Sequence, residues 1–339
     1  MSSRHKRAAE QRKPGELALI ERIRSRAKST RAAELVLGIG DDCAILQPRP
    51  GEAIAVTTDL SVAGRHFLLD WHPPEVVGHR TLARGLSDLA AMGARPLAAF
   101  LSLALPGNLV RGPAPWIDRF LDGFLALAAI HRAPLAGGDL AQAPLALADI
   151  VLVGAVPASR ALLRSGARPG NQLYVTGTLG GAASALAMLR ELAANRRRSK
   201  MLSIPARSQP DLAAHFYPQP RIAQGLWLRN RATSAIDLSD GLSTDLFHLC
   251  AESGVAAEVD AESLPLHRKA TLDQALHGGE DYELLFTASP ATRIPRSIAG
   301  VPVTRIGQIV NRRRNRPAIV LKTGARTVAL QARGWQHFA

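Results

Sequence analysis

The sequence predicts a mixed α/β (α+β) protein of two domains. Its 339 residues exceed the usual size of one domain, so two hydrophobic cores are expected. Strand-like and helix-like segments alternate along the chain, which is typical of such folds. A stretch rich in Arg, Ser, Pro and Gly over 157–170 separates two groups of these segments. We therefore divide the chain into a basic arm (1–15), an N-terminal domain (16–157) and a C-terminal domain (158–339).

The first group of segments predicts a sheet covered by long helices. Residues 73–92 begin with prolines and stop at Gly93, and residues 116–131 carry apolar side chains at helical spacing. Runs rich in β-branched and aliphatic residues predict the strands. The expected elements are helices 16–26, 73–92 and 116–131, and strands 34–39, 53–58, 98–104 and 145–156.

The second group repeats this alternation after the connector. A strand at 172–176 leads through a glycine-rich turn (177–181) into a helix at 182–192. The N–H groups of that turn are one way to hold a phosphate, although an ordinary strand-to-helix connection is the favoured interpretation. The remaining expected elements are helices 221–231 and 243–252, and strands 256–259 and 284–287.

The composition is that of a globular cytoplasmic protein. Hydrophobic residues make up 47% of the chain and charged residues 21%. The two cysteines, Cys43 and Cys250, are too few for a disulfide framework and form no zinc-binding pair. The basic start is no secretory signal, and the sequence lacks a run of about 18 apolar residues that would span a membrane.

The net charge of +14 raises the alternative of nucleic-acid binding. The basic residues gather at 4–13, 196–200 and 312–316, without interleaved aromatic residues and without a known nucleic-acid-binding signature. Solvated loops therefore explain this charge better than a nucleic-acid partner. A basic exterior would also attract polyphosphate substrates.

Carboxylates cluster in this basic chain, often beside glycine. One such cluster alone is usually a turn or a helix cap, but several in one chain indicate a site. Oxygen ligands without His or Cys favour Mg²⁺, which takes one or two carboxylates together with substrate phosphates. The clusters are Asp41–Asp42, Thr57–Asp59, Ser87–Asp88, Gly138–Asp139, Asp237–Gly241 and Gly278–Asp281.

Familiar nucleotide-binding signatures are missing from the sequence. It has no Walker loop, no protein-kinase motif set and no EF-hand loop. An enzyme of this kind that uses ATP would hold the phosphates through carboxylate-bound metal ions rather than through a lysine cradle.

In this order the clusters closely resemble those of the thiamine-monophosphate kinase family. The resemblance runs from about residue 16 to the end of the chain. The matching segments are GIGDDCAIL (38–46), TTDLSVAGRHF (57–67), LSDLAAMGA (86–94), AGGD (136–139), IDLSDGL (236–242), GGEDYELLF (278–286) and GWQHF (334–338). The family is similar to aminoimidazole ribonucleotide synthetase.

The resemblance implies ATP-dependent phosphorylation of thiamine monophosphate to thiamine diphosphate, by direct in-line transfer with several Mg²⁺ ions. It implies the two-domain aminoimidazole ribonucleotide synthetase-like fold, a homodimer joined through the N-terminal sheet, and a site between the domains. The implied metal residues are Asp42, Thr57, Thr58, Asp59, Asp88, Asp139, Asp237 and Asp240. The implied ATP contacts are Gly138, Asp139, Arg164 and Ser239, and the implied substrate contacts are His66, Glu280 and Trp335. A Tyr that contacts the nucleotide in some relatives is replaced here by Leu121.

The expected chemistry needs no general base in the protein. A phosphate monoester has a second pKa of about 6, so its oxygen is already ionised at neutral pH. The protein's task is then to overcome charge repulsion and to align the two phosphates. For three side chains a purely structural role is the alternative. Asp41 could be a turn residue, His66 a structural loop histidine, and Trp335 an anchor for the tail.

Two related activities fit the sequence less well. A selenophosphate synthetase would carry a reactive Cys or selenocysteine in a glycine-rich N-terminal segment, and the hydrogenase-maturation enzyme would end in a reactive Cys. This chain has no cysteine near either end and finishes with His337, Phe338 and Ala339.

Overall fold

The computed structural model describes residues 15–28, 30, 32–194, 202, 204 and 209–336. The predictions for the basic arm therefore lie outside the described residues, apart from Gly15. The basic segment 196–200 lies outside them as well.

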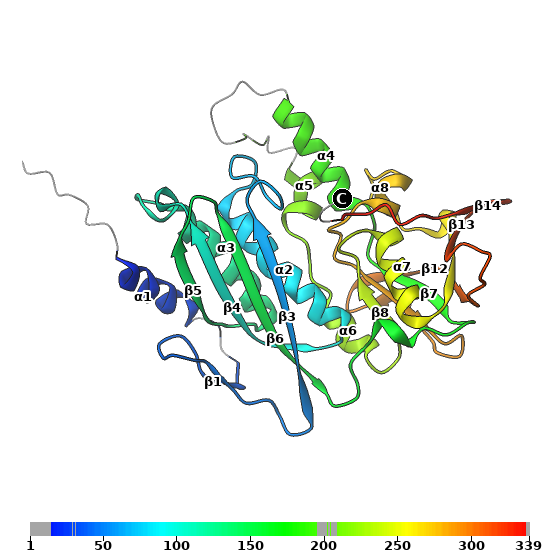
Figure 1. The fold of residues 1–339 in the computed structure, drawn as a ribbon, viewed down its shortest axis with the longest axis horizontal. Helices are drawn as coiled ribbons and strands as arrows, with labels where there is room; N and C mark the ends of the chain where they lie inside the picture. Colours follow the sequence, from blue (N-terminus) through cyan, green and yellow to red (C-terminus); the bar gives the residue numbers. More distant parts are fainter. Residues whose placement is uncertain are drawn as a thin grey trace, which may run out of the picture.

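A four-stranded sheet forms the N-terminal domain (Figure 1). Its strand order is β3-β6-β4-β5. Strand β6 runs antiparallel to both β3 and β4, and β5 runs parallel to β4. The elements of this domain are α1 (Glu16–Ala27), β1 (Leu35–Leu37), β2 (Ile45–Leu46), β3 (Glu52–Val62), α2 (Pro74–Ala91), β4 (Arg95–Leu105), η1 (Gly107–Val110), α3 (Trp116–His131), β5 (Leu135–Gln142) and β6 (Leu147–Pro157).

Helix α2 is the central element of the fold. Pro74 occupies its first turn, where a missing N–H costs nothing, and Glu75 complements the positive end of the helix dipole. The helix packs on β3 and β6 of its own domain, beside α3, and on α6 (Ile222–Leu228) and β8 (Ser234–Asp237) of the other domain. Both domains therefore position the side chains that α2 carries.

An eight-stranded sheet forms the C-terminal domain, in the order β14-β13-β9-β12-β7-β10-β8, with β11 paired to β12. Its neighbouring strands are antiparallel except β13 and β9. The further elements here are η2 (Arg164–Gly166), β7 (Gln172–Thr176), α4 (Gly181–Ala194), α5 (Gln209–Phe216), α7 (Leu242–Ser253), β9 (Ala256–Asp260), η4 (Ala261–Ser263), α8 (Leu272–His277), β10 (Leu284–Ala288), β11 (Ser297–Ile298), β12 (Val301–Val310), β13 (Ile319–Thr323) and β14 (Arg326–Ala329).

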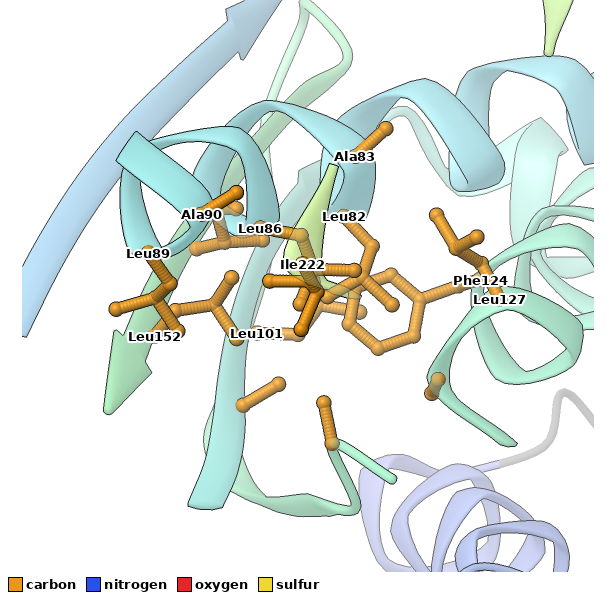
Figure 2. Close-up of a cluster of buried hydrophobic side chains, with 14 of the residues drawn as sticks. Leu82, Ala83, Leu86, Leu89, Ala90, Leu101, Phe124, Leu127, Leu152 and Ile222 are labelled. Carbon is orange, nitrogen blue, oxygen red and sulfur yellow. The ribbon is translucent and has the colours of Figure 1, made fainter. Parts of the chain in front are cut away.

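The hydrophobic cores do not follow the expected domain division strictly. The larger core is built on Leu82, Leu86 and Phe124, and it also includes Ile222 of α6 (Figure 2). Phe286 of β10 belongs to the same core. A second core lies within the C-terminal domain alone. The two domains thus share a continuous apolar contact along α2, which fixes their relative position at the site.

The other face of the N-terminal sheet is largely uncovered. Side chains of a strand alternate between its two faces. On β3 this alternation leaves Ile54, Val56 and Leu60 exposed, at 45%, 60% and 44%. Helices α2 and α3 lie on the opposite face (Figure 1). A row of apolar side chains along a strand at the edge of a sheet is a surface suited to a partner.

The sequence patterns located six helices, α1–α4, α6 and α7, but missed α5, α8 and the strands β2, β5, β8, β11, β12, β13 and β14. The residues of β5, LAGGDLAQ, include two adjacent glycines and an aspartate, which are disfavoured in strands. Pairing with β4 overrides this local preference. Among the described residues, no helix is long and apolar enough to cross a membrane.

Candidate active site

Helix α2 presents a row of charged side chains along one face. Arg80, Arg84 and Asp88, which we call the α2 row, are spaced four residues apart and therefore lie one above the other. The Oγ1 atom of Thr57 donates a hydrogen bond of 2.5 Å to Asp88. Arg84 forms an ion pair with Asp59, with 2.7 Å between Nη2 and Oδ1. Thr57 and Asp59 face α2 because they are two residues apart on β3.

The C-terminal domain places the carboxylate of Asp237 next to the α2 row. Asp237, at the end of β8, is 3% exposed and accepts a hydrogen bond of 2.7 Å from Ser87 Oγ. Ser87 directly precedes Asp88 on α2. The helix therefore brings Asp88 from one domain and Asp237 from the other to the same place, together with Asp59 of β3.

Burial disfavours the ionised form of each carboxylate at this meeting point. Burial raises the pKa of Asp59 to about 6, opposed by Arg84 and reinforced by the charge of Asp88. Burial also raises the pKa of Asp237 to about 7, with Asp88 adding to the rise and Ser87 and Arg164 opposing it. Burial raises the pKa of Asp88 as well. Neighbouring carboxylates that resist ionisation together are stabilised by a bound cation.

Arg164 supplies positive charge to the same place from η2. Its side chain is exposed, and its charge lowers the pKa of both Asp88 and Asp237. Its backbone oxygen accepts a hydrogen bond of 2.6 Å from Ser253 of α7.

Other residues expected in the site lie on a loop, on β5 and on β3. Asp42 is exposed, and its backbone N–H donates to Asp41 Oδ1 at 2.9 Å, which gives Asp41 the bonding of a turn residue. Gly138 and Asp139 are exposed on β5, where Asp139 accepts from the backbone N–H of Leu140 at 2.8 Å. The strand alternation places Thr58 on the uncovered face of β3, opposite to Thr57 and Asp59.

The segment 237–241 is held by an internal carboxylate. Asp245 accepts hydrogen bonds from the backbone N–H groups of Asp240 and Gly241, at 3.1 and 3.0 Å. Burial raises the pKa of Asp245 to about 8, and the charges of Asp237 and Asp240 add to this rise. Ser239 accepts at its backbone oxygen from the N–H of Glu280 at 2.8 Å.

The segment 278–283 adopts a strained backbone. Glu280 and Tyr282 have φ of +69° and +51°, values that non-glycine residues rarely adopt and that concentrate at functional sites. Between them, the Asp281 carboxylate accepts from the backbone N–H groups of Gly180 and Ala182, at 2.6 and 3.1 Å. The N–H groups at the start of α4 therefore bind an internal carboxylate, consistent with the favoured interpretation of this turn.

Two of the three residues expected to contact the acceptor, His66 and Glu280, lie beside the α2 row. A pocket is lined by Ser61, His66, Phe67, Val77, Arg80, Thr81 and Arg84. His66 Nδ1 accepts a hydrogen bond of 3.0 Å from the N–H of Val62. Glu280 forms an ion pair of 2.6 Å with Arg80, although burial alone would raise its pKa. The charge of Arg80 reverses this effect and holds the pKa of Glu280 well below its usual range.

Trp335 lies near another part of the site. Its backbone N–H donates to Asp240 O at 3.0 Å, and its residue is 48% exposed. The preceding Gly334 donates to Thr244 Oγ1 at 3.0 Å. The C-terminal tail is thus fixed along the segment that carries Asp240.

Sequence reasoning gave no role to several residues of this arrangement, although Ser87 and Asp281 belong to the clusters that it singled out. Arg80 and Arg84 supply its buried cations, Ser87 binds Asp237, and Asp245 and Asp281 hold the loops. The signal for the two arginines was present in the sequence. Charges spaced four residues apart in a helix that is otherwise apolar mark one face that cannot join the core.

The comparisons with known proteins agree with this architecture. Residues 40–157 match the AIR synthase related protein, N-terminal domain, and residues 168–319 match the AIR synthase related protein, C-terminal domain. The thiamine-monophosphate kinase of Salmonella typhimurium is 42% identical over 307 residues, which cover 87% of this chain and 90% of the relative.

Solved structures show the same similarity. The thiamine-monophosphate kinase of Stenotrophomonas maltophilia matches with a TM-score of 0.77 and 41% identity, over 91% of this chain and 96% of that one. AaThiL complexed with AMPPCP and TMP matches with a TM-score of 0.73 and 28% identity, over 96% and 97% of the two chains. The two-domain fold, the carboxylates gathered on α2 and the identity to these relatives together show that the chain belongs to the thiamine-monophosphate kinase family.

Proposed function

We propose that this protein transfers the γ-phosphoryl group of ATP to thiamine monophosphate, giving thiamine diphosphate and ADP. The observation that carries the proposal is the meeting of Asp59, Asp88 and Asp237 at α2, beside a pocket lined by His66, Arg80 and Arg84. The family membership and the complex of AaThiL with AMPPCP and TMP support the choice of substrates.

The residues fit the Mg²⁺ ions that the family resemblance implies. Their donor atoms are carboxylate and hydroxyl oxygens, the ligands that Mg²⁺ prefers. Among the described residues, no group of three or more His, Cys, Asp or Glu side chains is arranged to hold a metal ion by itself. Mg²⁺ usually takes one or two carboxylates together with waters and substrate phosphates. We propose as metal-holding residues Asp42, Thr57, Thr58, Asp59, Asp88, Asp139, Asp237 and Asp240. The side chain of Thr58 lies on the opposite face of β3, so only its backbone carbonyl oxygen could serve beside Thr57 and Asp59.

The protein's own groups then have separate tasks. Bound Mg²⁺ would neutralise the phosphate charges and help to align the two phosphates in line. Gly138, Asp139, Arg164 and Ser239 would contact ATP, and Arg164 is exposed at the start of η2. His66, Glu280 and Trp335 would contact thiamine monophosphate. No protein group needs to remove a proton, because the acceptor oxygen is ionised above a pKa of about 6.

We propose further that the protein is a homodimer joined through the uncovered face of the N-terminal sheet. The exposed Ile54, Val56 and Leu60 support this, since they form an apolar row on β3. Val56→Lys should convert the dimer to a monomer in sedimentation velocity. Val328→Lys, at a comparably exposed valine of β14 (53%), is the matched control and should leave the mass unchanged. We place the reaction in the cytoplasm, where ATP is supplied.

The deciding assay gives the purified protein ATP, Mg²⁺ and either thiamine monophosphate or free thiamine. Thiamine monophosphate should yield thiamine diphosphate and ADP in one step. Free thiamine should be a poor acceptor, because it presents a hydroxyl group and the site offers no base to activate it. Rapid phosphorylation of thiamine without turnover of the monophosphate would overturn the proposal.

A further inference from the structure

Arg80 is the most extensively bonded buried cation near the acceptor pocket. Its side chain is 5% exposed, at the first position of the α2 row. Nη2 donates to Glu280 Oε1 at 2.6 Å and to the backbone oxygen of His66 at 3.5 Å. Nη1 donates to the backbone oxygen of His215 on α5. One guanidinium therefore connects α2, the loop that carries His66, the segment of Glu280, and α5.

Two neutral histidines complete the surroundings of Arg80. Its Nη1 lies 3.1 Å from His215 Nδ1, and because arginine only donates, Nδ1 accepts. His215 Nε2 lies 3.1 Å from His72 Nε2. His72 Nδ1 lies 3.1 Å from the backbone nitrogen of Leu68 and 3.2 Å from the Leu68 carbonyl oxygen, so it has a backbone partner in either tautomer. Each ring nitrogen therefore has a hydrogen-bond partner while both histidines are uncharged. Burial lowers the pKa of both rings, in agreement with uncharged rings.

The charge balance makes Arg80 the counter-charge of Glu280. The second oxygen of Glu280 lies 3.4 Å from His215 Nδ1, but that nitrogen is occupied as an acceptor from Arg80. The cluster thus contains one cation, one anion and two neutral rings. Without Arg80, the Glu280 carboxylate would lose its ion-pair partner in a backbone conformation that already carries strain.

The position of Arg80 on α2 relates it to the carboxylate site. Arg80 and Asp88 are two helical turns apart, about 12 Å along the axis. Asp88 lies at the meeting point of the carboxylates, and Arg80 fixes the residues expected to hold the acceptor. A rigid, buried helix therefore sets the separation between these two parts of the site.

We propose that Arg80 is a positioning residue for the acceptor: it orients the Glu280 carboxylate and the His66 loop, and His215 and His72 hold its guanidinium in place. The inference rests on the proposed function, in which Glu280 and His66 contact thiamine monophosphate. Arg80 acts on the reaction only through these residues. Its loss should therefore affect recognition of the acceptor and leave recognition of ATP unchanged.

The test compares the kinetics of Arg80→Gln, Arg80→Lys and Glu280→Gln with the full-length enzyme. Arg80→Gln should raise KM for thiamine monophosphate at least about tenfold and keep KM for ATP within about twofold. Arg80→Lys keeps the charge but loses the forked geometry, so its KM should lie between those of the wild type and Arg80→Gln. The double variant Arg80→Gln/Glu280→Gln should be less impaired than the product of the two single effects.

Arg119→Gln is the matched control. Arg119 also joins α2, through an ion pair of 2.8 Å with Glu75, but its side chain is 48% exposed. Loss of such a surface pair has little effect, so both KM values should stay within about twofold of the wild type.

The possible outcomes separate this inference from the proposed function. If the wild type does not phosphorylate thiamine monophosphate, the proposed function is wrong and the inference is wrong with it. If the wild type is active but Arg80→Gln changes only the melting temperature or kcat, Arg80 is a structural brace and the inference alone is overturned. Should Arg80→Gln fail to fold, Arg80→Lys decides: an unchanged KM for thiamine monophosphate would overturn the inference.

Discussion

The two domains build their parts of the site in different ways. The N-terminal domain presents Thr57, Asp59 and Asp88 from a strand and a helix, where the backbone is regular. The C-terminal domain presents Asp240 and Glu280 from loops that contain positive φ angles. Internal carboxylates hold these loops. The regular elements are rigid because they belong to the shared core, whereas the loops depend on a few buried polar contacts.

Because of this difference, the two domains would contribute to the proposed reaction in different ways. The N-terminal residues are fixed relative to α2, on which Arg80 and Asp88 lie. The C-terminal domain adds Asp237, at the end of β8, and Glu280, on a loop, to that helix through direct bonds with Ser87 and Arg80. The proposed site would therefore be complete only when both domains are docked along α2. The predictions below test this comparison.

The largest effect is expected from removing one carboxylate on either side of the domain boundary. Asp88→Asn and Asp237→Asn should each lower turnover at least about 10³-fold, roughly 4 kcal/mol, because both domains are required. Neither change should lower the melting temperature, since burial already disfavours the ionised forms of these carboxylates.

Steady-state assays at limiting and saturating Mg²⁺ check this prediction, with circular dichroism to confirm the fold. Asp118→Asn, on the surface of α3, is the control and should retain full activity. If Asp237→Asn stayed active at limiting Mg²⁺ while Asp88→Asn did not, the N-terminal domain alone would supply the metal residues.

The second prediction compares backbone rigidity in the two domains. At Gly138 on β5, a Cβ atom would lie 1.9 Å from the backbone oxygen of Leu101, at φ +150°. At Gly241, in the loop before α7, the nearest atoms would be 2.9 Å away, at φ +112°. Gly138→Ala should therefore lower the free energy of unfolding by about 3 kcal/mol or more, and Gly241→Ala by about 1–2 kcal/mol.

Urea unfolding of both variants measures the difference. Equal losses of stability would mean that the loop is as constrained as the strand, and the contrast between the domains would not hold.

The same contrast decides what the sequence could predict. Helices 74–91 and 116–131 were expected to within a residue or two, because their apolar spacing and proline starts are local signals. The carboxylate clusters were visible for the same reason. The bonds from Asp281 to the start of α4, and from Arg80 to Glu280, join residues about 100 and 200 positions apart. Local patterns carry no information about such pairs.

Strand β5 is a second feature that local sequence patterns cannot predict. Its glycines and aspartate contradict a strand when they are considered alone, and only pairing with β4 produces one. The residues chosen as metal, nucleotide and acceptor contacts stay predictions, and the variants described here test them.

The third prediction concerns the histidines between the domains. Burial lowers the pKa of His72 to about 3, whereas the unfolded chain protonates near its ordinary pKa of about 6.5. Between these values the unfolded state binds more protons, so stability rises with pH and is fully present above about 6.5. At pH 5 His72 alone should reduce the free energy of unfolding by about 2 kcal/mol.

Urea titrations at pH 7.5 and 5.0 measure this loss, and His72→Gln should make it smaller. The control is His248→Gln on α7, whose ring is exposed and remote from His72; it should leave the pH dependence unchanged. Buried carboxylates with raised pKa values, such as Asp237 and Asp245, change stability in the opposite direction over this range, so the comparison between the wild type and His72→Gln decides. If both proteins lost the same stability between pH 7.5 and 5.0, His72 would accept a proton in the folded state, contrary to the neutral assignment around Arg80.

The smallest effect is expected at Trp335, which lies in the C-terminal tail of the second domain. Its backbone N–H bonds Asp240, and Gly334 bonds Thr244, so Trp335→Ala removes the ring and keeps the tail in place. The thiazolium of thiamine monophosphate is cationic and gains about 1–2 kcal/mol from a desolvated aromatic face. Trp335→Ala should therefore weaken thiamine monophosphate binding about tenfold, with ATP affinity unchanged, and Trp335→Phe should recover part of it.

Isothermal titration of both ligands, beside a melting curve of each variant, distinguishes a binding role from an anchoring one. An anchor would lower the melting temperature and leave the two affinities in their original ratio. Because the backbone bonds of the tail do not depend on the indole ring, we expect the melting temperature to change little. A reduced melting temperature with unchanged affinity for thiamine monophosphate would remove Trp335 from the acceptor site and leave Glu280 and His66 as its proposed contacts.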